Sequence, residues 1–390
     1  MTEILALENL HTSGVYNKRS VTMVRGEGAL LWDDQGREYI DCVGGQGAAN
    51  LGHANAAVAA AIAEQAQRLI SLTEIFPNEQ RARLSDRLCQ LADMPRVYLC
   101  NSGTEAIEAA FKFARVVTHR TEIIAAMRGF HGRTMGALSA TWNKAYREPF
   151  EPLVPGFRHV PYNNLDALSK AVNEKTAAVI LEVVQGEGGV YPGTSEYLRG
   201  AQQICQERGA MFIVDEVQTG FGRTGKLFAF QHHDLRPDLL CLAKSIAGGV
   251  PMGATLIGER LGVLPGHIHG STFGGNPLAC AASLAALGEM ERLDLSARAA
   301  ENGAHFMERL QDAARNSPLI REVRGLGLLV GVELKKKSAP FLQALTEHGV
   351  VALSAGMNVV RFLPPLVITC EQLDCVANTL QQVLSQPVSE

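Results

Sequence analysis

Two acids directly follow an apolar run in MFIVDEVQTGFGRTG, residues 211–225. Met211 to Val214 are apolar, and Asp215 and Glu216 then lead into a loop with three glycines. A carboxylate in such a place is costly unless a positive group meets it. A metal ion, a cation bound to a nucleotide, an arginine or a protonated ring nitrogen of a cofactor could each supply that charge.

A lysine stands in a comparable place in LLCLAKSIAGGVPMG, residues 239–253. Desolvation at the end of a strand can remove the proton of Lys244, which could then attack a carbonyl group. Taken alone, a surface lysine at a turn is the commoner case. Lys244 lies 29 positions after Asp215, a spacing that can bring both residues to one edge of a parallel sheet. Pyridoxal phosphate requires this pair, because the lysine holds its aldehyde carbon and the acid keeps its ring nitrogen protonated.

Such a cofactor also needs a phosphate site, which NSGTEAIEAAFKFAR at 101–115 could supply. Ser102, Gly103 and Thr104 offer hydroxyl and backbone N–H groups where a helix begins, and a helix N-terminus favours an anion. An ordinary N-cap with Glu105 in the first turn explains the same residues equally well.

Three further loops carry polar groups at or near predicted strand ends. In RGFHGRTMGALSAT, residues 128–141, Phe130 could stack on a flat ring and Arg133 could bind a carboxylate. Taken singly, a core phenylalanine and a solvated arginine are the commoner cases. LEVVQGEGGVYPG at 181–193 adds Glu182 and Glu187, and HGSTFGGNP at 269–277 adds hydroxyls beside glycines.

Two other enzyme classes could use some of these residues. An ATPase would bind magnesium through the two acids, but it requires GxxxxGK[ST], and the only Gly-Lys pair, Gly225-Lys226, is followed by leucine. A metal hydrolase could use the histidines at 232–233 and 267–269, but the chain has no HExxH motif. We therefore predict no metal site.

The elements that must position these residues alternate along the middle of the chain. We predict strands at 97–100, 122–126, 178–181, 212–214, 239–242 and 254–257. Helices are predicted at 104–117, 165–173, 195–207 and 277–290. This order predicts an α/β fold with a mostly parallel sheet, in which ligands gather at the carboxyl ends of the strands.

The two ends of the chain differ from the middle. Residues 26–41 are typical of a β-hairpin with its turn at 33–36, and residues 322–335 and 349–369 contain further strand-like runs among helices. We predict a large cofactor-binding domain at 56–285 and a smaller α+β domain built from residues 1–55 and 286–390.

Composition limits the partners and the compartment. The 390 residues are 46% hydrophobic with a net charge of −4, which supports neither a nucleic-acid partner nor a membrane-surface partner. The first residues lack the parts of a signal peptide, so we expect a cytoplasmic protein. The eight cysteines include no CxxC pair, and we predict neither a zinc ribbon nor a disulfide framework.

Taken together and in order, these motifs resemble the class-III, fold-type I aminotransferases, which depend on pyridoxal phosphate. The matching stretches are RGEGALLWDDQGREYIDCVGG, NSGTEAIEAAFKFAR, GFHGRT, VQGEGG, VDEVQTGFGRTG, LAKSIAGG, GSTFGGNPLAC and RFLPPLV. The chain is most similar to the acetylornithine aminotransferases. It also resembles the branch that acts on carrier-protein-bound aminoadipate semialdehyde in lysine biosynthesis, a similarity suggested by AAMRGFHGRTMGALSATWNKAYREPF.

The resemblance implies roles for particular residues. Lys244 would bond to the cofactor and move the substrate proton, and Asp215 would pair with the pyridine nitrogen. The other cofactor-binding residues would be Ser102, Gly103 and Thr104 at the phosphate, Phe130 and Val217 on the two ring faces, Gln218 at the ring hydroxyl, and His131. Thr272 would reach the phosphate of the neighbouring subunit in a homodimer with shared active sites.

Substrate binding is implied for Tyr16, Arg133, Glu187 and Arg361. A pair between Glu187 and Arg361 would mask the arginine in one half-reaction and release it for 2-oxoglutarate in the other. The implied reaction moves an ω-amino group from acetylornithine, or from a carrier-protein-bound lysine precursor, to 2-oxoglutarate. Ornithine and 4-aminobutyrate aminotransferases, and an aminomutase or a decarboxylase on the same fold, are the alternatives.

Two departures from the family pattern are visible. Val183 replaces a proline that often follows the glutamate before VQGEGG, and Ile107 replaces an asparagine in the phosphate helix. We expect the loop after Val183 to differ slightly, because valine keeps an N–H group that proline lacks. Glu216 gains no catalytic role, and we expect it to be structural.

Overall fold

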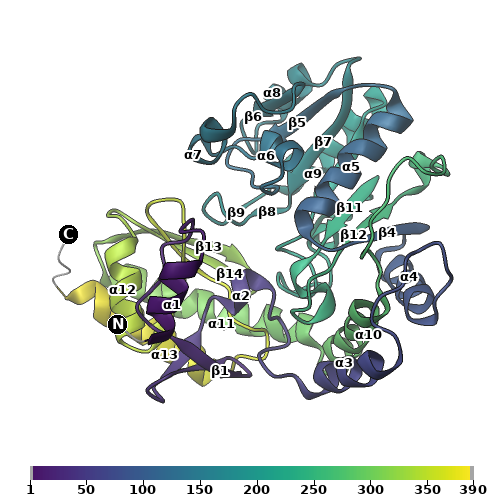
Figure 1. Cartoon of the computed structure of the whole chain (residues 1–390). Coiled ribbons are helices and arrows are strands. Elements are labelled where there is room, and N and C mark those ends of the chain that lie inside the picture. The colour runs from purple at the N-terminus through teal and green to yellow at the C-terminus, as the bar shows by residue number, and fades with distance from the viewer. Residues whose placement is uncertain (1–2, 387–390) are drawn as a thin grey trace.

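The computed structural model describes residues 3–386, and a sheet of seven strands forms its centre (Figure 1). In spatial order the strands are β4 (Arg96–Cys100), β12 (Gly253–Ile257), β11 (Leu239–Leu242), β10 (Met211–Asp215), β7 (Thr176–Glu182), β5 (Glu122–Ala126) and β6 (Phe157–Val160). Strand β12 runs antiparallel to both of its neighbours, and the other neighbouring pairs are parallel. The predicted α/β class with a mostly parallel sheet is confirmed, and β6 is a strand that the sequence did not predict.

Helices cover both faces of this sheet. Successive residues of a strand point to opposite faces, so Ile213 of β10 packs with α5 (Gly103–Thr118), whereas Phe212 and Val214 pack with α9 (Ser195–Arg208). Every residue of β7 and β10 is buried, as is usual for strands covered on both sides. The remaining helices around the sheet are α3 (Ala56–Arg68), α4 (Glu79–Ala92), α6 (Met135–Ala140), α7 (Lys144–Arg147), α8 (Leu165–Ala171) and α10 (Pro277–Arg292).

The two ends of the chain meet in a four-stranded sheet. Its strands are β1 (Met23–Glu27), β2 (Leu30–Asp33), β3 (Glu38–Asp41) and β15 (Val350–Val351), and β15 runs parallel to β3. Strands β2 and β3 form the hairpin that the sequence predicts, and its turn is held by bonds from the N–H groups of Gln35 and Arg37 to Asp33. Strand β1 extends that hairpin by a further antiparallel strand.

A second four-stranded sheet comes from the C-terminal region alone. It consists of β13 (Ile320–Leu326), β14 (Leu329–Leu334), β17 (Val359–Phe362) and β16 (Leu353–Ala355). Helices α11 (Leu295–Asn316), α12 (Ala339–Glu347) and α13 (Cys370–Ser385) accompany it, and α1 (Glu3–His11) begins the described part of the chain with no buried residue. None of the helices in residues 3–386 is long and apolar enough to cross a membrane.

One fully buried arginine joins segments that are distant in sequence. Arg223 donates hydrogen bonds to the carbonyl groups of Leu328 and Pro364 and to the side chain of Asn50. Burial lowers the pKa of Arg223 to about 9, against the opposing charge of Asp41. The loop after β10 is thereby tied to both ends of the chain.

Candidate active site

A cavity of about 610 Å³ lies where β7 and β10 end. Fourteen of the residues singled out in the sequence line it: Tyr16, Ser102, Gly103, Thr104, Phe130, His131, Arg133, Glu182, Glu187, Asp215, Val217, Gln218, Lys244 and Arg361. They come from segments spread between residues 16 and 361, so the fold brings together groups that the sequence keeps far apart. Among residues 3–386, Thr272 is not part of the cavity lining.

The acid at the end of β10 is oriented by two neighbours. Asp215 Oδ1 accepts a hydrogen bond from the N–H of Val217 at 3.0 Å, and Oδ2 lies 2.8 Å from Nδ1 of His131. Burial lowers the pKa of His131, but the hydrogen bond to Asp215 and the charges of Asp215 and Glu182 outweigh it, so that this pKa is raised. The buried carboxylate of Asp215 therefore lines the cavity, and His131 and the N–H of Val217 fix its orientation.

The lysine stands on a strained turn just after β11. Lys244 has a φ of +47°, which is uncommon for a residue with a side chain. The next residue, Ser245, donates its hydroxyl to the carbonyl groups of Gly47 and Ala48, so the turn is held from the N-terminal region. Burial lowers the pKa of Lys244 to about 8, which makes a much larger share of its amine neutral and nucleophilic near pH 7 than in water.

The start of α5 forms another part of the cavity wall. Ser102 is the N-cap, and its hydroxyl accepts a bond from the N–H of Glu105 at 3.3 Å. Gly103 follows with no room for a side chain, because an added Cβ would lie 2.7 Å from Cγ1 of Val217. Ser102 is therefore an N-cap, and because the positive N-terminal end of the helix lines the cavity, the phosphate site stays a prediction.

An arginine and a glutamate pair on another side of the cavity. Arg361 Nη2 donates to Oε1 of Glu187 at 2.6 Å, and Nη1 donates to Oε1 of Gln218 at 3.1 Å. Arg361 is 2% exposed, whereas the Glu187 side chain is 27% exposed. The carboxylate is therefore the partner with room to move, and its movement would uncover a buried guanidinium.

The aromatic side of the cavity carries an exposed arginine. The guanidinium carbon of Arg133 lies 3.5 Å from the ring centroid of Tyr146 and 5.7 Å from that of Phe130. Stacking keeps its planar donors free to face a carboxylate. Tyr16 also lines the cavity, although 78% of it is exposed.

Thr272 lies apart from this group. It is exposed in the segment before α10, and its expected contact with a second subunit remains a prediction.

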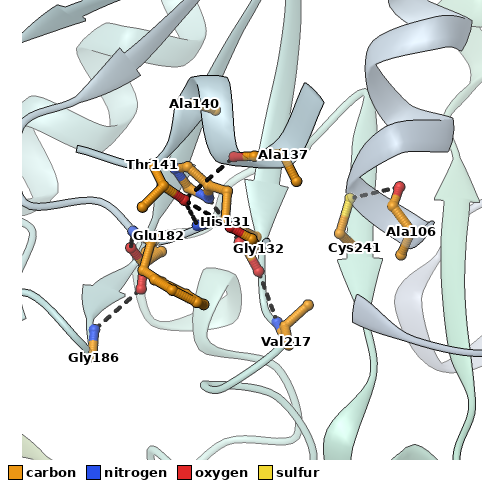
Figure 2. A network of polar contacts seen from close by, with 12 residues as sticks. Ala106, His131, Gly132, Ala137, Ala140, Thr141, Glu182, Gly186, Val217 and Cys241 are labelled. Atoms are coloured by element: carbon orange, nitrogen blue, oxygen red, sulfur yellow. Dashed lines mark hydrogen bonds and ion pairs between the residues drawn. The ribbon is translucent and has the colours of Figure 1, made fainter. Parts of the chain in front are cut away.

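Glu182 is a site residue whose role the sequence did not indicate (Figure 2). It ends β7 and pairs in register with Asp215, the end of β10. Its two carboxylate oxygens accept bonds from the N–H groups of Phe130 at 3.0 Å and Gly186 at 3.1 Å. Burial raises the pKa of Glu182 to about 7, although the charge of His131 opposes that rise. The strand end before a glycine-rich loop was the available signal, and only the register shows its closeness to Asp215.

Glu216 is absent from the cavity lining, which agrees with the structural role expected for it. It is fully buried, and its carboxylate accepts bonds from the N–H groups of Ala229 and Phe230, both at 2.7 Å. Ile107, which is part of α5, is also fully buried, and its side chain packs in an apolar cluster.

The chemistry of the cavity wall fits pyridoxal 5′-phosphate. Lys244 supplies an amine with a lowered pKa for an aldehyde, and Asp215 supplies a buried carboxylate for a ring nitrogen. The start of α5 supplies an anion site in which any side chain at Gly103 would collide with Val217. These groups match the aldehyde, the ring nitrogen and the phosphate of the cofactor.

Comparison with known proteins agrees with this match. The profile of class-III aminotransferases matches residues 13–384. A LysW-aminoadipate semialdehyde transaminase of Deinococcus radiodurans is 51% identical over 98% of this chain and 90% of its own. An acetylornithine aminotransferase of Methanothermobacter thermautotrophicus is 42% identical over 98% of both chains.

Solved structures show the same fold. The ornithine aminotransferase of Toxoplasma gondii superimposes with a TM-score of 0.94 at 34% identity, covering 98% of this chain and 93% of that one. The acetylornithine aminotransferase of Elizabethkingia anophelis gives a TM-score of 0.87 at 34% identity over 98% of both chains. The chain therefore belongs to the class-III aminotransferases, which are transaminases dependent on pyridoxal phosphate.

Proposed function

We propose that the enzyme transfers the ω-amino group of N2-acetylornithine, or of a carrier-protein-bound lysine precursor, to 2-oxoglutarate. Glutamate is the second product, and the reaction serves arginine or lysine biosynthesis. The names and identities of the D. radiodurans and M. thermautotrophicus relatives support this choice of substrates.

The observation that carries the proposal is the pair between Glu187 and Arg361. An ω-amino donor and 2-oxoglutarate must use one cavity in turn, yet they place carboxylates differently. With Glu187 on Arg361, the guanidinium is neutralised, and an apolar donor chain can pass it. When Glu187 moves away, Arg361 presents two donors to a carboxylate of 2-oxoglutarate or glutamate.

Each remaining residue has a task in this scheme. Bound pyridoxal phosphate supplies an electron-accepting ring that stabilises negative charge on the carbon next to the substrate nitrogen. Lys244 holds the cofactor between turnovers and moves the proton at that carbon. Asp215, oriented by His131, would keep the ring nitrogen protonated, and the start of α5 would hold the phosphate. Phe130 and Val217 would contact the ring, and Gln218 would bond its hydroxyl group.

The proposal includes a homodimer and an unequal division of the chain. Thr272 is exposed and outside the cavity of its own chain, which is consistent with a contact across a subunit boundary.

Tyr16 and Arg133 lie at the exposed side of the cavity, where the donor or its carrier protein would arrive. Residues 56–285 form the cofactor-binding domain in this proposal, and residues 1–55 and 286–390 form the smaller one.

Steady-state kinetics with 2-oxoglutarate as acceptor test the proposal. We expect kcat/KM for N2-acetylornithine or for carrier-bound lysine to exceed that for ornithine and for 4-aminobutyrate by at least about tenfold, or roughly 1.4 kcal/mol. The better of the two preferred donors identifies the pathway. A larger value for ornithine or for 4-aminobutyrate would contradict the proposal and favour an ornithine or a 4-aminobutyrate aminotransferase, respectively.

A further inference from the structure

The glutamate that faces Arg361 stands on a strained loop. We call residues 186–190, between β8 (Val184–Gln185) and β9 (Tyr191–Pro192), the gate loop. Val190 has a φ of +58° and is fully buried, and a positive φ is a genuine outlier for a β-branched side chain. Such strain persists only where surrounding contacts impose it. The contacts that hold the gate loop therefore decide where Glu187 can reach.

A buried arginine on β13 provides one of these contacts. Arg324 Nε donates to the carbonyl oxygen of Gly189 at 2.9 Å. Its Nη1 lies 2.7 Å from carboxylate oxygens of both Glu322 and Glu333, which offset the cost of burying its charge. Its guanidinium carbon also lies 3.9 Å from the ring centroid of Tyr191, the first residue after the gate loop.

Tyr191 is held by further groups. The guanidinium carbon of Arg128 lies 4.5 Å from the same ring centroid, and the Tyr191 hydroxyl donates to Glu333 at 3.3 Å. Strand β13 lies against β9 along this contact. The gate loop is thus fastened to the C-terminal sheet at its outer end.

Arg324 and Arg361 stand in one row of the C-terminal sheet. Arg324 of β13 pairs with Gly331 of β14, and Gly331 pairs in turn with Arg361 of β17. A Cβ at Gly331 would lie 2.9 Å from Cβ of Val190. The strained Val190 is therefore seated over the glycine between the two arginines, one of which bonds Gly189 and the other Glu187.

We propose that Arg324 is a positioning residue that holds the gate loop on the sheet and so sets how often Glu187 covers Arg361. This inference rests on the proposed exchange of partners at Arg361. Arg324 acts through the loop and does not line the cavity. With the loop fastened at Gly189, Glu187 returns to Arg361 after each glutamate half-reaction. With the loop released, Arg361 stays uncovered for longer and favours dicarboxylates.

The chain offers a matched control. Arg321 lies on the same strand and bonds the other oxygen of Glu333 at 2.8 Å, but its side chain is 57% exposed. The contact of Arg321 with Glu333 involves neither Gly189 nor Tyr191. Arg324→Lys keeps the charge and loses the planar fork, whereas Arg321→Lys makes the same change without touching the gate loop. Tyr191→Leu removes the ring on which Arg324 and Arg128 stack and leaves these two arginines unchanged.

Single-turnover rates of the cofactor-loaded enzyme provide the first measurement. For Arg324→Lys we expect the ratio of kcat/KM for the ω-amino donor to that for glutamate to fall about tenfold, mainly through KM. Tyr191→Leu should shift the ratio in the same direction, and Arg321→Lys should leave it within twofold. An unchanged ratio in Arg324→Lys, or an equal loss in both half-reactions, would overturn the proposal.

Hydrogen–deuterium exchange at residues 184–192 provides the second measurement, with and without the cofactor. We expect exchange there to rise at least fivefold in Arg324→Lys, with no rise in β1 and β2 and none in Arg321→Lys. A rise spread over the whole chain would indicate a purely structural role and overturn the inference. If the wild type rejects both proposed donors, the proposed function fails; exchange at the gate loop and the KM for glutamate still decide on Arg324.

Discussion

At the scale of single residues, the proposed role of Lys244 makes uptake of the cofactor depend on the protonation of its amine. Burial lowers the pKa of this amine to about 8, while the charge of Glu187 opposes that effect and the charge of Arg361 adds to it. The neutral amine is the attacking form. Its share therefore increases as pH rises through the lowered pKa and levels off above it.

We accordingly predict that capture of pyridoxal phosphate by the cofactor-free chain accelerates about fivefold between pH 7 and pH 8 and flattens above about pH 9. Stopped-flow absorbance measures this rate. Lys244→Ala serves as the control, and borohydride should attach the cofactor covalently to the wild-type chain but not to this variant. A profile that continues to rise up to the ordinary lysine pKa would show that burial does not act on this amine as described.

Removal of Glu216 should affect the stability of the fold. Burial raises the pKa of Glu216 to about 7, while the N–H groups of Phe230 and Ala229 oppose the rise. The folded state thus holds this proton more tightly than the unfolded chain. The contribution of Glu216 to stability is full below about pH 4.5, falls as pH rises to about 7, and is constant above that.

We predict that Glu216→Ala lowers the free energy of unfolding by roughly 2 kcal/mol or more at pH 5, because two buried N–H groups lose their acceptor. The deficit should shrink by pH 8. Denaturant titrations at both pH values measure it, and kcat/KM of the folded variant should stay within about threefold of the wild type. A folded variant without activity would give Glu216 a part in the chemistry.

At the scale of elements, the contact between the start of α5 and the loop after β10 shapes the phosphate site. The Cβ of an alanine at Gly103 would lie 2.7 Å from Cγ1 of Val217, so the helix or the loop would have to shift. We predict that Gly103→Ala weakens binding of pyridoxal phosphate at least about tenfold, or 1.4 kcal/mol. Titration of the cofactor-free chain gives the dissociation constant.

Two further variants make this prediction specific. Adding Val217→Ala should recover part of the lost affinity, because it removes the colliding atoms. Gly288→Ala changes an exposed glycine of α10 with nothing within 4 Å of the new Cβ. It should leave affinity unchanged and stabilise the helix by about 1 kcal/mol. Equal affinities in Gly103→Ala and Gly288→Ala would show that the close contact is unimportant.

Elements with a strong local pattern were predictable, and those defined by pairing were not. Strand β7 and helix α9 agree with prediction to within a few residues, because apolar runs and caps mark them locally. Strand β6 reads FRHV, a short run with two polar residues, and it forms through its pairing with β5. Glu182 was noted as a polar residue at a strand end, but its position beside Asp215 was not predictable, since only the register of β7 with β10 places it there.

At the scale of the whole molecule, the sequence indicated which residues line the cavity better than it indicated what holds them. The family motifs are compact stretches, so Lys244 and Asp215 could be proposed as catalytic residues by pattern, and both line the cavity. The row of Arg324, Gly331 and Arg361 depends on strand partners that no local pattern specifies. Arg223 was likewise not singled out in the sequence, yet it is fully buried and bonds to distant segments.

The parallel pairing of β15 with β3 has a consequence for how the chain is made. Strand β3 ends at Asp41, and its partner begins at Val350, so roughly 300 residues must leave the ribosome between the two. At translation speeds of about 5–20 residues per second, that interval is roughly 15–60 s. The hairpin at the start of the chain waits during this time with an unpaired edge, which is a site for mispairing with other nascent chains. The finished enzyme closes that edge with almost the last strand to be synthesised.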